Sequence, residues 1–359
     1  MKNRCICSAL ACVGAVIGAG FASGREVISF FTRYDVHSWW LILLSAITTT
    51  GLCALCMRNA NGGCATCWCD LYRGSHKLVR LGAQLCATLL MAVVGGAMIS
   101  ASGHMVAMLW PSAWAYPIGA VGTMLLAWRV GFGGTKPLTL ASAVLGLLFM
   151  LAIFAILASE PRNTQAAASL QPPSTVGELV LAGINAVAYA AMNLTIALGV
   201  ICRCAGNTRR YACRVSVCFG LLLVGLLFVS NYLYLKHPEL SQDAFAMVRL
   251  LSGFGRAGFI ISVTLMYLAV VTTLVATLCT LRNAVEQHEK RPALQACATL
   301  GLPLCFSLLG FSEIVNRMYA PAGICCLLFV FAPVFVLRCI QRRKAKRRSP
   351  KAYGIGIPS

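Results

Sequence analysis

Acidic residues are scarce in this sequence. Only ten Asp and Glu occur among 359 residues, and charged residues of both signs make up 11% of the chain. Soluble domains carry about 25% charged and about 45–50% apolar residues, so the composition excludes an ordinary soluble enzyme. The sequence also contains no His-Glu-x-x-His, no Gly-x-Ser-x-Gly and no Walker-type phosphate loop. These absences argue against an enzyme and against an ATP-driven pump carried by this chain alone.

Apolar residues fill most of the chain instead. They make up 59% of it, and the mean hydropathy is +0.78. A helix needs roughly 20 apolar residues to cross the hydrocarbon core of a membrane. We therefore predict an all-α integral membrane protein with about ten spans, and a re-entrant or interfacial helix at Ala244–Phe254. The predicted spans are Ile6–Thr32, Trp39–Met57, Leu78–Leu109, Trp114–Trp128, Leu138–Ser159, Val176–Ile201, Val215–Leu235, Phe259–Leu281, Pro292–Gly310 and Ile314–Leu337.

Positive charges outnumber negative ones, with thirty Lys and Arg and a formal net charge of +20. In a soluble protein this excess would suggest nucleic-acid binding, but the cytoplasmic loops of membrane proteins are also enriched in Lys and Arg. An even number of spans with both termini in the cytoplasm places all but seven of these cations on that side. The charge therefore predicts topology, with the lipid bilayer as partner and no nucleic acid. The seven exceptions are Arg25, Arg33, Arg162, Lys236, Arg249, Arg256 and Arg317.

Nineteen cysteines are scattered through spans and cytoplasmic loops, which argues against an extracellular disulfide scaffold. The densest group is Cys64, Cys67 and Cys69. The Cys64-x-x-Cys67 spacing is one that zinc sites use. Cysteine is also a small apolar residue in a reducing compartment, so both interpretations of this group stay open.

Glycine is concentrated in the first span, in the run Gly14-Ala-Val-Ile-Gly-Ala-Gly-Phe-Ala-Ser-Gly-Arg-Glu26. Four glycines in eleven residues, closed by two opposite charges, are not typical of a lipid-facing helix. Interrupted backbone is tolerated inside a membrane only where it lines a cavity or contacts protein. We therefore predict a discontinuous helix whose free amide and carbonyl ends face a site near the membrane midplane.

The sixth span carries polar side chains at membrane depth, at Asn185, Tyr189, Asn193 and Thr195. Such residues are costly in lipid and usually face the interior of a helix bundle. A polar loop at 160–175 precedes this span and divides a single transmembrane domain, 1–340, into five-span halves, 1–159 and 176–340. Halves with an odd number of spans must have opposite orientations. The pattern predicts a 5+5 inverted repeat with discontinuous first and sixth helices, followed by a basic cytoplasmic tail at 341–359.

The eighth span places Ala269, Thr272 and Thr273 on one helical face. Two hydroxyls and a main-chain oxygen are hard ligands that suit an alkali cation. Threonine hydroxyls in membrane helices also commonly bond back to carbonyls of their own helix. Spacing alone leaves both interpretations open.

The motif from Gly14 to Val27 resembles the signature of the YkvI-like bacterial membrane proteins, which belong to the amino acid–polyamine–organocation superfamily and have the LeuT fold. The stretch Tyr189-Ala-Ala-Met-Asn193 is also similar to that family, and the ten-span layout covers nearly the whole chain. The resemblance implies a multi-pass transporter in the bacterial cytoplasmic (inner) membrane, with both termini in the cytoplasm.

The resemblance further implies where ligands sit. In LeuT-fold transporters the solute lies between the first and sixth helices, and sodium lies between the first and eighth. The implied sodium ligands are the carbonyls of Gly14, Ile17 and Ala269 and the hydroxyls of Thr272 and Thr273. The implied solute-binding residues are Ala19, Gly20, Phe21 and Ala22, whose amides would meet a carboxylate, Ala188 and Tyr189, whose carbonyls would meet an amine, and Asn193.

Two departures from the family pattern bear on the coupling ion. Transporters that use two sodium ions have an amide residue directly after the Gly-x-Gly of the first helix, where this chain has Phe21. At most one sodium ion is therefore implied. Some proton-coupled relatives place a lysine from the fifth span in the sodium site, but Leu138–Ser159 has no charged residue. This favours sodium over protons, and no other cofactor is expected.

Arg25 and Glu313 lie near helix ends on the same predicted external face. We hypothesise that they pair as an extracellular gate when the solute site is occluded; the alternative is a set of interfacial charges that extend toward water. The predicted function is a sodium-coupled secondary transporter for a small organic solute, an amino acid or a related amine. The alternative function is a solute sensor that has a transporter fold but does not transport.

Overall fold

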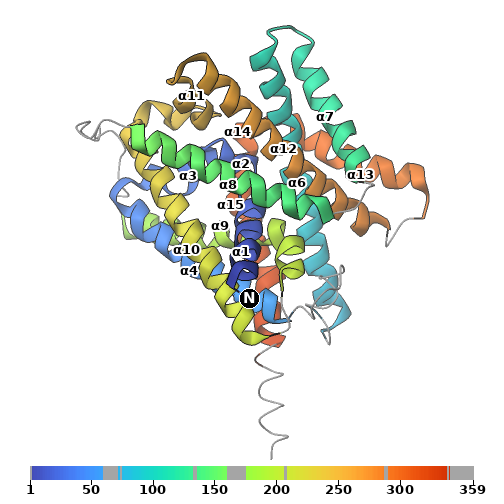
Figure 1. Cartoon of the computed structure of the whole chain (residues 1–359). Coiled ribbons are helices and arrows are strands. Elements are labelled where there is room, and N and C mark those ends of the chain that lie inside the picture. Colours follow the sequence, from blue (N-terminus) through green and yellow to red (C-terminus); the bar gives the residue numbers. More distant parts are fainter. Residues whose placement is uncertain are drawn as a thin grey trace, which may run out of the picture.

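The computed structural model describes residues 2–59, 72, 75–131, 136–159, 175–205, 208–286, 290–337 and 339. Cys64, Cys67 and Cys69, most of the loop at 160–175 and the tail 341–359 lie outside these residues, so the predictions made for them stay predictions. The described chain is almost entirely helical (Figure 1).

The helices follow the predicted spans closely. The elements of the first half are α1 (Lys2–Val16), α2 (Ala19–Ala22), α3 (Arg25–Phe30), the 3-10 helix η1 (Thr32–His37), α4 (Ser38–Asn59), α6 (Lys77–Leu109), α7 (Ala115–Gly131) and α8 (Lys136–Ser159). Those of the second half are α9 (Val176–Arg203), α10 (Arg209–Lys236), the 3-10 helix η2 (Pro238–Gln242), α11 (Ala246–Ser252), α12 (Gly255–Glu286), α13 (Pro292–Ser307), α14 (Phe311–Glu313), the π-helical turns η3 (Ile314–Met318) and η4 (Cys326–Phe331), and between these turns α15 (Tyr319–Cys325).

Seven helical segments of the described chain are long and apolar enough to cross a membrane. They are Thr32–Arg58, Lys77–Leu109, Leu140–Ser159, Val176–Arg203, Arg209–Lys236, Gly255–Glu286 and Phe311–Leu337. The other three predicted spans are the shorter helices α1, α7 and α13. The protein therefore has the multi-pass helical architecture that the composition predicts, and α11 forms at the segment predicted to be too short to span.

Helix pairings in one half have counterparts in the other. Helix α1 packs against α8 and α10, and α9 packs against α15 and α4. These are equivalent pairings if α1 corresponds to α9, α4 to α10, and α8 to the last span. Helices α6 and α12, which correspond to each other, pack together. The pairings are those of an inverted repeat and support the predicted division at 159 and 176, whose limits stay a prediction.

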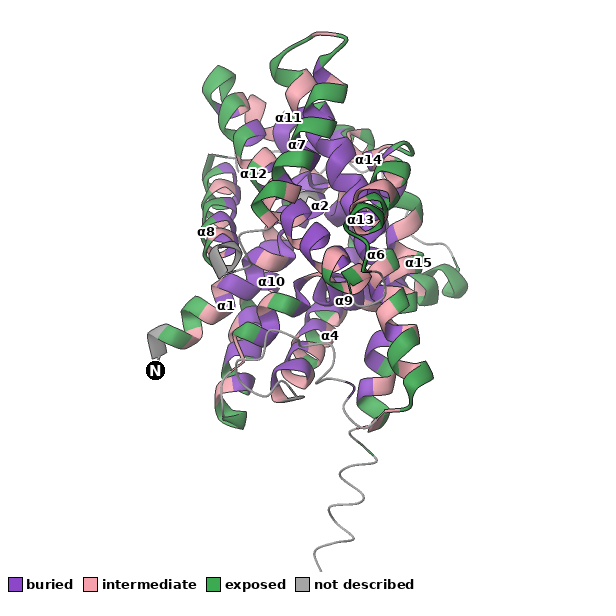
Figure 2. Cartoon of the chain, turned by 90° about the vertical axis from the view of Figure 1, so that its right-hand side faces the viewer, coloured by how far each residue is buried: buried purple, intermediate pink, exposed green. Residues whose placement is uncertain are grey.

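Buried residues gather in the middle of the bundle, around α2, α6 and α9, and exposed residues lie on the outer helices (Figure 2). Large apolar side chains on the outside include Ile118 of α7, Leu151 of α8 and Leu302 of α13. In a membrane protein such side chains face lipid rather than water, so their exposure fits the predicted integral membrane class. Among the cysteines, Cys202 is disulfide-bonded and the buried Cys12 is a thiol.

The predicted interruption of the sixth helix is wrong: α9 is one unbroken helix from Val176 to Arg203. The stretch Ala186–Ala191 contains four alanines and no glycine, and alanine is the strongest helix former. The polar side chains also bond within the helix. The Asn193 amide donates to the Tyr189 carbonyl at 3.2 Å, and the Thr195 hydroxyl donates to the Ala191 carbonyl at 2.8 Å.

Candidate functional site

The first span is broken where the glycine motif predicts. Helix α1 ends at Val16 and α2 begins at Ala19. At the break, the Gly18 amide donates to the Val16 carbonyl at 2.7 Å. In a continuing helix it would donate to the Gly14 carbonyl instead. The Gly14 carbonyl is thereby released from the helical pattern, and Ile17 lies between the two helices. The break supplies main-chain oxygens inside the bundle.

Each glycine around the break has a different close neighbour. A Cβ on Gly14 would collide with the Ser142 carbonyl, so this glycine lets α1 approach the backbone of α8. A Cβ on Gly18 would lie 3.3 Å from the Thr273 hydroxyl oxygen of α12. The structure therefore brings the break in the first span against the eighth span, as the sodium-site prediction requires.

Gly20 and Gly24 make room for two larger side chains. A Cβ on Gly20 would collide with the Glu26 carboxyl group, and one on Gly24 would collide with the Tyr234 hydroxyl group. Gly24 also has φ +83, a left-handed backbone conformation that side chains with a Cβ rarely adopt. Backbone geometry and contact therefore both favour glycine at Gly24, whereas a Cβ at Gly20 would force the Glu26 carboxyl group to shift.

The two threonines of α12 make different contacts. The Thr272 hydroxyl donates to the Ala269 carbonyl at 3.1 Å, which is the back-bonding alternative that the sequence left open. Thr273 instead lies beside Gly18 at the break. Thr273 therefore lies beside the break, and the sodium assignment stays a prediction.

Six of the residues predicted to bind solute are buried, but the carbonyl groups of Ala188 and Tyr189 are occupied. The six are Gly20, Phe21, Ala22, Ala188, Tyr189 and Asn193. Phe21 and Ala22 of α2 are about 1% exposed. The Ala188 carbonyl packs against Gly323 of α15, where a Cβ would collide with it. The Tyr189 carbonyl accepts the Asn193 amide. These carbonyls lie inside an unbroken helix, so the prediction that they receive a solute amine is not what the structure shows.

Glu26 was not among the residues predicted to be functional; in the sequence it is one of two opposite charges that close the glycine run. Glu26 is 4% exposed, and in the described part of the chain its Oε2 atom has no hydrogen-bond partner. Its carboxyl group lies near the Tyr189 and Tyr319 side chains and within hydrogen-bonding reach of Asn193. A glutamate inside an apolar run is itself a signal of a functional position, and the adjacent Arg25 obscured it.

Tyr189 occupies the same interior region. Its ring lies 5.1 Å from the Phe30 ring and 5.0 Å from the Phe31 ring. It is fully buried, and its hydroxyl group has no hydrogen-bond partner among the described residues. Two polar atoms without hydrogen-bond partners among the described residues, Oε2 of Glu26 and the Tyr189 hydroxyl oxygen, therefore lie in one aromatic interior between the first span and α9. Buried polar groups in native proteins nearly always have partners, so such a pair marks a candidate site.

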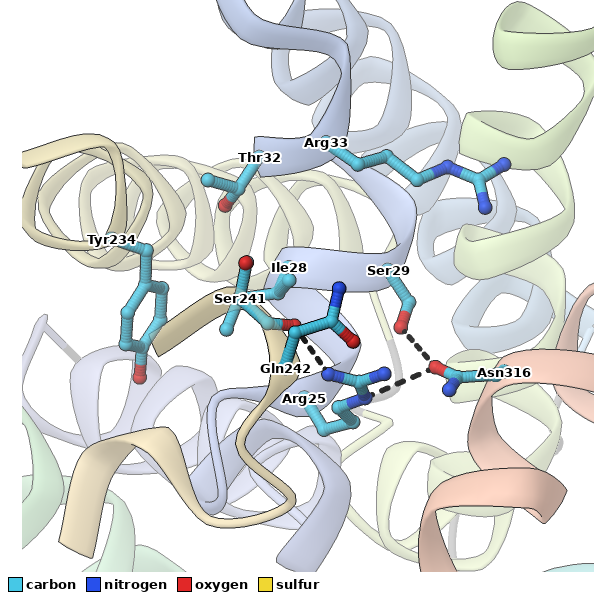
Figure 3. Close-up of a pocket in the computed structure, with 9 residues that line it drawn as sticks. All are labelled: Arg25, Ile28, Ser29, Thr32, Arg33, Tyr234, Ser241, Gln242 and Asn316. Atoms are coloured by element: carbon cyan, nitrogen blue, oxygen red, sulfur yellow. Dashed lines mark hydrogen bonds between the residues drawn. The ribbon is translucent and has the colours of Figure 1, made fainter. Parts of the chain in front are cut away.

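A cavity of about 370 Å³ lies beside Arg25, and we call it the Arg25 cavity (Figure 3). Arg25 extends across it to two segments of the second half of the chain. Its Nε donates to Oδ1 of Asn316 at 3.1 Å, and its Nη1 donates to the Ser241 carbonyl at 2.5 Å. The Ser29 hydroxyl also donates to Asn316, at 2.7 Å. The first span is thus fastened to η3 and to η2.

The predicted gate pair, Arg25 with Glu313, is not formed. Glu313 instead pairs with Arg317 at 2.6 Å, one helical turn further along. Both of those side chains are more than half exposed, whereas Asn316 points toward Arg25 in the cavity (Figure 3). Arg25 is therefore held by neutral acceptors. The sequence could not distinguish Asn316 from Glu313 as its partner, because both lie near the start of the last span.

Comparisons with known proteins agree with this geometry. No protein-family model matches the chain. A Bacillus subtilis (strain 168) protein described as the uncharacterized membrane protein YkvI is 24% identical over 343 residues, which cover 94% of this chain and 95% of that protein. The structure is similar to the inward-facing conformation of Mhp1, with a TM-score of 0.63, 13% identity, and coverage of 90% of this chain and 73% of the other. The chain has the LeuT-type fold.

A manganese transporter from Eremococcus coleocola shares this LeuT-type fold, with a TM-score of 0.57 and 13% identity over 92% of this chain and 78% of that one. Within the fold, the discontinuous first helix of this chain is α1 to α3, and its eighth helix is α12. The break at Ile17 and Gly18 and its contact with Thr273 thus occupy the positions that the resemblance implied for a sodium site.

Proposed function

We propose that this protein is a secondary active transporter for a small organic solute, an amino acid or a related amine, coupled to sodium by alternating access. The observation that carries the proposal is the break in the first span, which lies against Thr273 of α12. A broken helix inside a bundle offers main-chain groups to a ligand without exposing them to lipid. The LeuT-type fold of the chain supports this interpretation.

The proposed solute site lies between α2 and α9. Main-chain amides near Ala19 and Gly20, at the start of α2, receive a carboxylate, whereas the Ala22 amide donates to the Gly18 carbonyl at 2.9 Å. Phe21 and Tyr189 supply aromatic walls. Aromatic surfaces suit an apolar or cationic solute group, which is why an amino acid or an amine is proposed.

The proposed sodium site lies at the break in the first span, just before α2. Gly14 and Ile17 supply carbonyls from the break, and Ala269, Thr272 and Thr273 supply oxygens from α12. Oxygen ligands of this kind match a hard cation. For Thr272 to take part, its hydroxyl group must keep a lone pair toward the ion while it donates to the Ala269 carbonyl, which hydroxyl geometry allows.

A ligand screen on the purified protein tests the proposal and identifies the solute at the same time. Amino acids and amines are tested by thermal unfolding in sodium and in potassium. Manganese is included because one structural neighbour is a manganese transporter. A ligand at 100 times its dissociation constant stabilises a protein by about 2.7 kcal/mol. The expected result is a solute that stabilises in sodium and not in potassium, and that proteoliposomes then accumulate.

The variant Thr273→Ala should weaken the sodium dependence of that stabilisation at least tenfold in sodium concentration, on the order of 1.4 kcal/mol. Thr280→Ala is the matched control. The Thr280 hydroxyl lies two turns beyond Thr273 on the same helix and donates to the Ala276 carbonyl at 2.9 Å. Equal sodium dependence in the wild type and both variants would contradict the sodium site. Solute binding without accumulation would indicate the sensor function instead.

A further inference from the structure

Glu26 directly follows Arg25, which lines the Arg25 cavity. Arg25 and Tyr234 both line the cavity, and the Tyr234 hydroxyl group packs against Gly24. Glu26, the next residue after Arg25, is 4% exposed and points the other way, against Gly20. A buried carboxyl group therefore belongs to the residue next to one that lines a cavity large enough to hold water.

The groups that face Glu26 are neutral. On α9 they are Tyr189 and Asn193, and on α15 the facing group is Tyr319. On α2 the contact is with the backbone at Gly20, and on α10 the Tyr234 hydroxyl group packs on Gly24. None of these five residues carries a positive charge at neutral pH.

The cations on the elements packed against α3 are directed elsewhere. Arg25 binds Asn316 and the Ser241 carbonyl on the cavity side. On η1, Arg33 donates to the Tyr34 hydroxyl group. On α10, Lys236 lies over the Tyr232 ring, and on η3, Arg317 pairs with Glu313. Within the described chain, Glu26 is thus a buried carboxyl group with no cationic partner.

An ionised carboxylate buried without a cation is strongly unfavourable, and such a group binds a proton instead. We propose that Glu26 is a proton-binding site and that this proton is co-transported. When the Arg25 contacts open, one proton from water in the cavity bonds to a Glu26 carboxylate oxygen. When Arg25 again binds Asn316 and Ser241, the neutral acid is enclosed. The same O–H bond breaks when the first span moves and exposes Glu26 to the opposite side, and the proton passes to water there.

This inference rests on the proposed transporter function and adds a second coupling ion to it. Glu26 belongs to the first span, whereas the lysine that some proton-coupled relatives use belongs to the fifth. The predicted fifth span of this chain, Leu138–Ser159, has no charged residue. Sodium at the break and a proton at Glu26 lie on opposite sides of α2, so one movement of the first span can expose or enclose both.

Infrared spectroscopy of the purified full-length protein in lipid nanodiscs tests the proton site directly. The carbonyl stretch of a protonated carboxylic acid is measured across a pH titration. The expected result is an acid band at neutral pH that is lost in Glu26→Gln and shifted in Glu26→Asp. Glu313→Gln is the matched control and should leave the band unchanged, because Glu313 is 54% exposed and pairs with Arg317. An acid band that is identical in wild type and Glu26→Gln would overturn the proposal.

Transport of the proton is measured separately in proteoliposomes, with a solute from the ligand screen and equal sodium on both sides. An imposed pH gradient should accelerate uptake by wild type, and Glu26→Gln should lose this acceleration while it keeps its sodium dependence. Uptake that is independent of the gradient would show that the proton is not co-transported and would overturn the proposal. Absence of any uptake by wild type would instead contradict the transporter function, and the infrared result is independent of it.

Discussion

The two spans that lead the two halves of the chain have similar positions and different backbones. The first span is interrupted between Val16 and Ala19, whereas α9 runs unbroken from Val176 to Arg203. Both contain small residues at membrane depth, but the first span has four glycines between Gly14 and Gly24, whereas the stretch Ala186–Ala191 of α9 has four alanines and no glycine. A close neighbour at the Cβ position does not by itself break a helix, because Gly96 and Gly220 have such neighbours inside the unbroken helices α6 and α10.

The two spans also contribute different kinds of groups to the candidate site. The broken span offers main-chain groups at Gly14 and Ile17 and places Glu26 in the interior. The unbroken α9 offers side chains, those of Tyr189 and Asn193, because its carbonyls are used within the helix or packed against α15. Polar side chains in a membrane helix thus do not indicate a break, since they can bond back to their own backbone.

The largest effect on this comparison is expected for Gly14→Ala. The new methyl group would collide with the Ser142 carbonyl, and overpacking of this kind costs about 1–3 kcal/mol. We expect a loss near the upper end, because the obstacle is backbone of α8 rather than a side chain that can move. Thermal unfolding in detergent measures it.

Gly51→Ala is the control for Gly14→Ala. Gly51 is in the interior of α4, and no heavy atom lies within 4 Å of a Cβ built there. Alanine is preferred to glycine in a helix by about 1 kcal/mol, so this variant should be stabilised. Similar destabilisation of both variants would show that the contact with α8 is not what requires glycine at position 14.

A smaller effect is expected for the double variant Ala190→Gly and Ala191→Gly, which gives α9 the kind of residue that interrupts the first span. Each substitution lowers helix stability by about 1 kcal/mol, for a total of about 2 kcal/mol. Backbone amides of α9 should then exchange hydrogen faster at these positions. Gly199→Ala, in open space on the same helix, should shift stability in the opposite direction. Unchanged exchange in α9 would contradict the role given to alanine.

The smallest effect is expected for Asn316→Ala, which removes the acceptor shared by Arg25 and Ser29. These hydrogen bonds are exposed, and each contributes about 1 kcal/mol or less to stability. The unfolding temperature should hardly change, but the amides of α3 should exchange hydrogen faster because the first span is no longer fastened to η3. Glu313→Gln should leave this exchange unaltered. If the exchange of α3 increased more in Glu313→Gln than in Asn316→Ala, the result would support the predicted Arg25–Glu313 gate instead.

Much of the fold could be predicted from local sequence. Long apolar runs mark spans because lipid offers no partner for charges, so the limits of segments such as α6 and α12 follow from composition. A break in the first span was predicted because four glycines lie close together at membrane depth, and the structure places it at Ile17 and Gly18. The resemblance to a family implied only that the first and eighth helices share an ion site, since spacing on α12 alone left the role of Thr273 open, and the structure supplied its contact with Gly18.

The sequence by itself determined which segments are helical, which are apolar enough for a membrane and where the first span is interrupted, because these depend on each residue's own solvation and backbone preferences. Only the tertiary structure decided that α9 stays intact, that Arg25 binds Asn316 rather than Glu313, and that Glu26 lies in the interior without a cationic partner. These outcomes depend on which groups from distant helices meet, and a carboxyl group one residue from an arginine has the same local sequence whichever way it points.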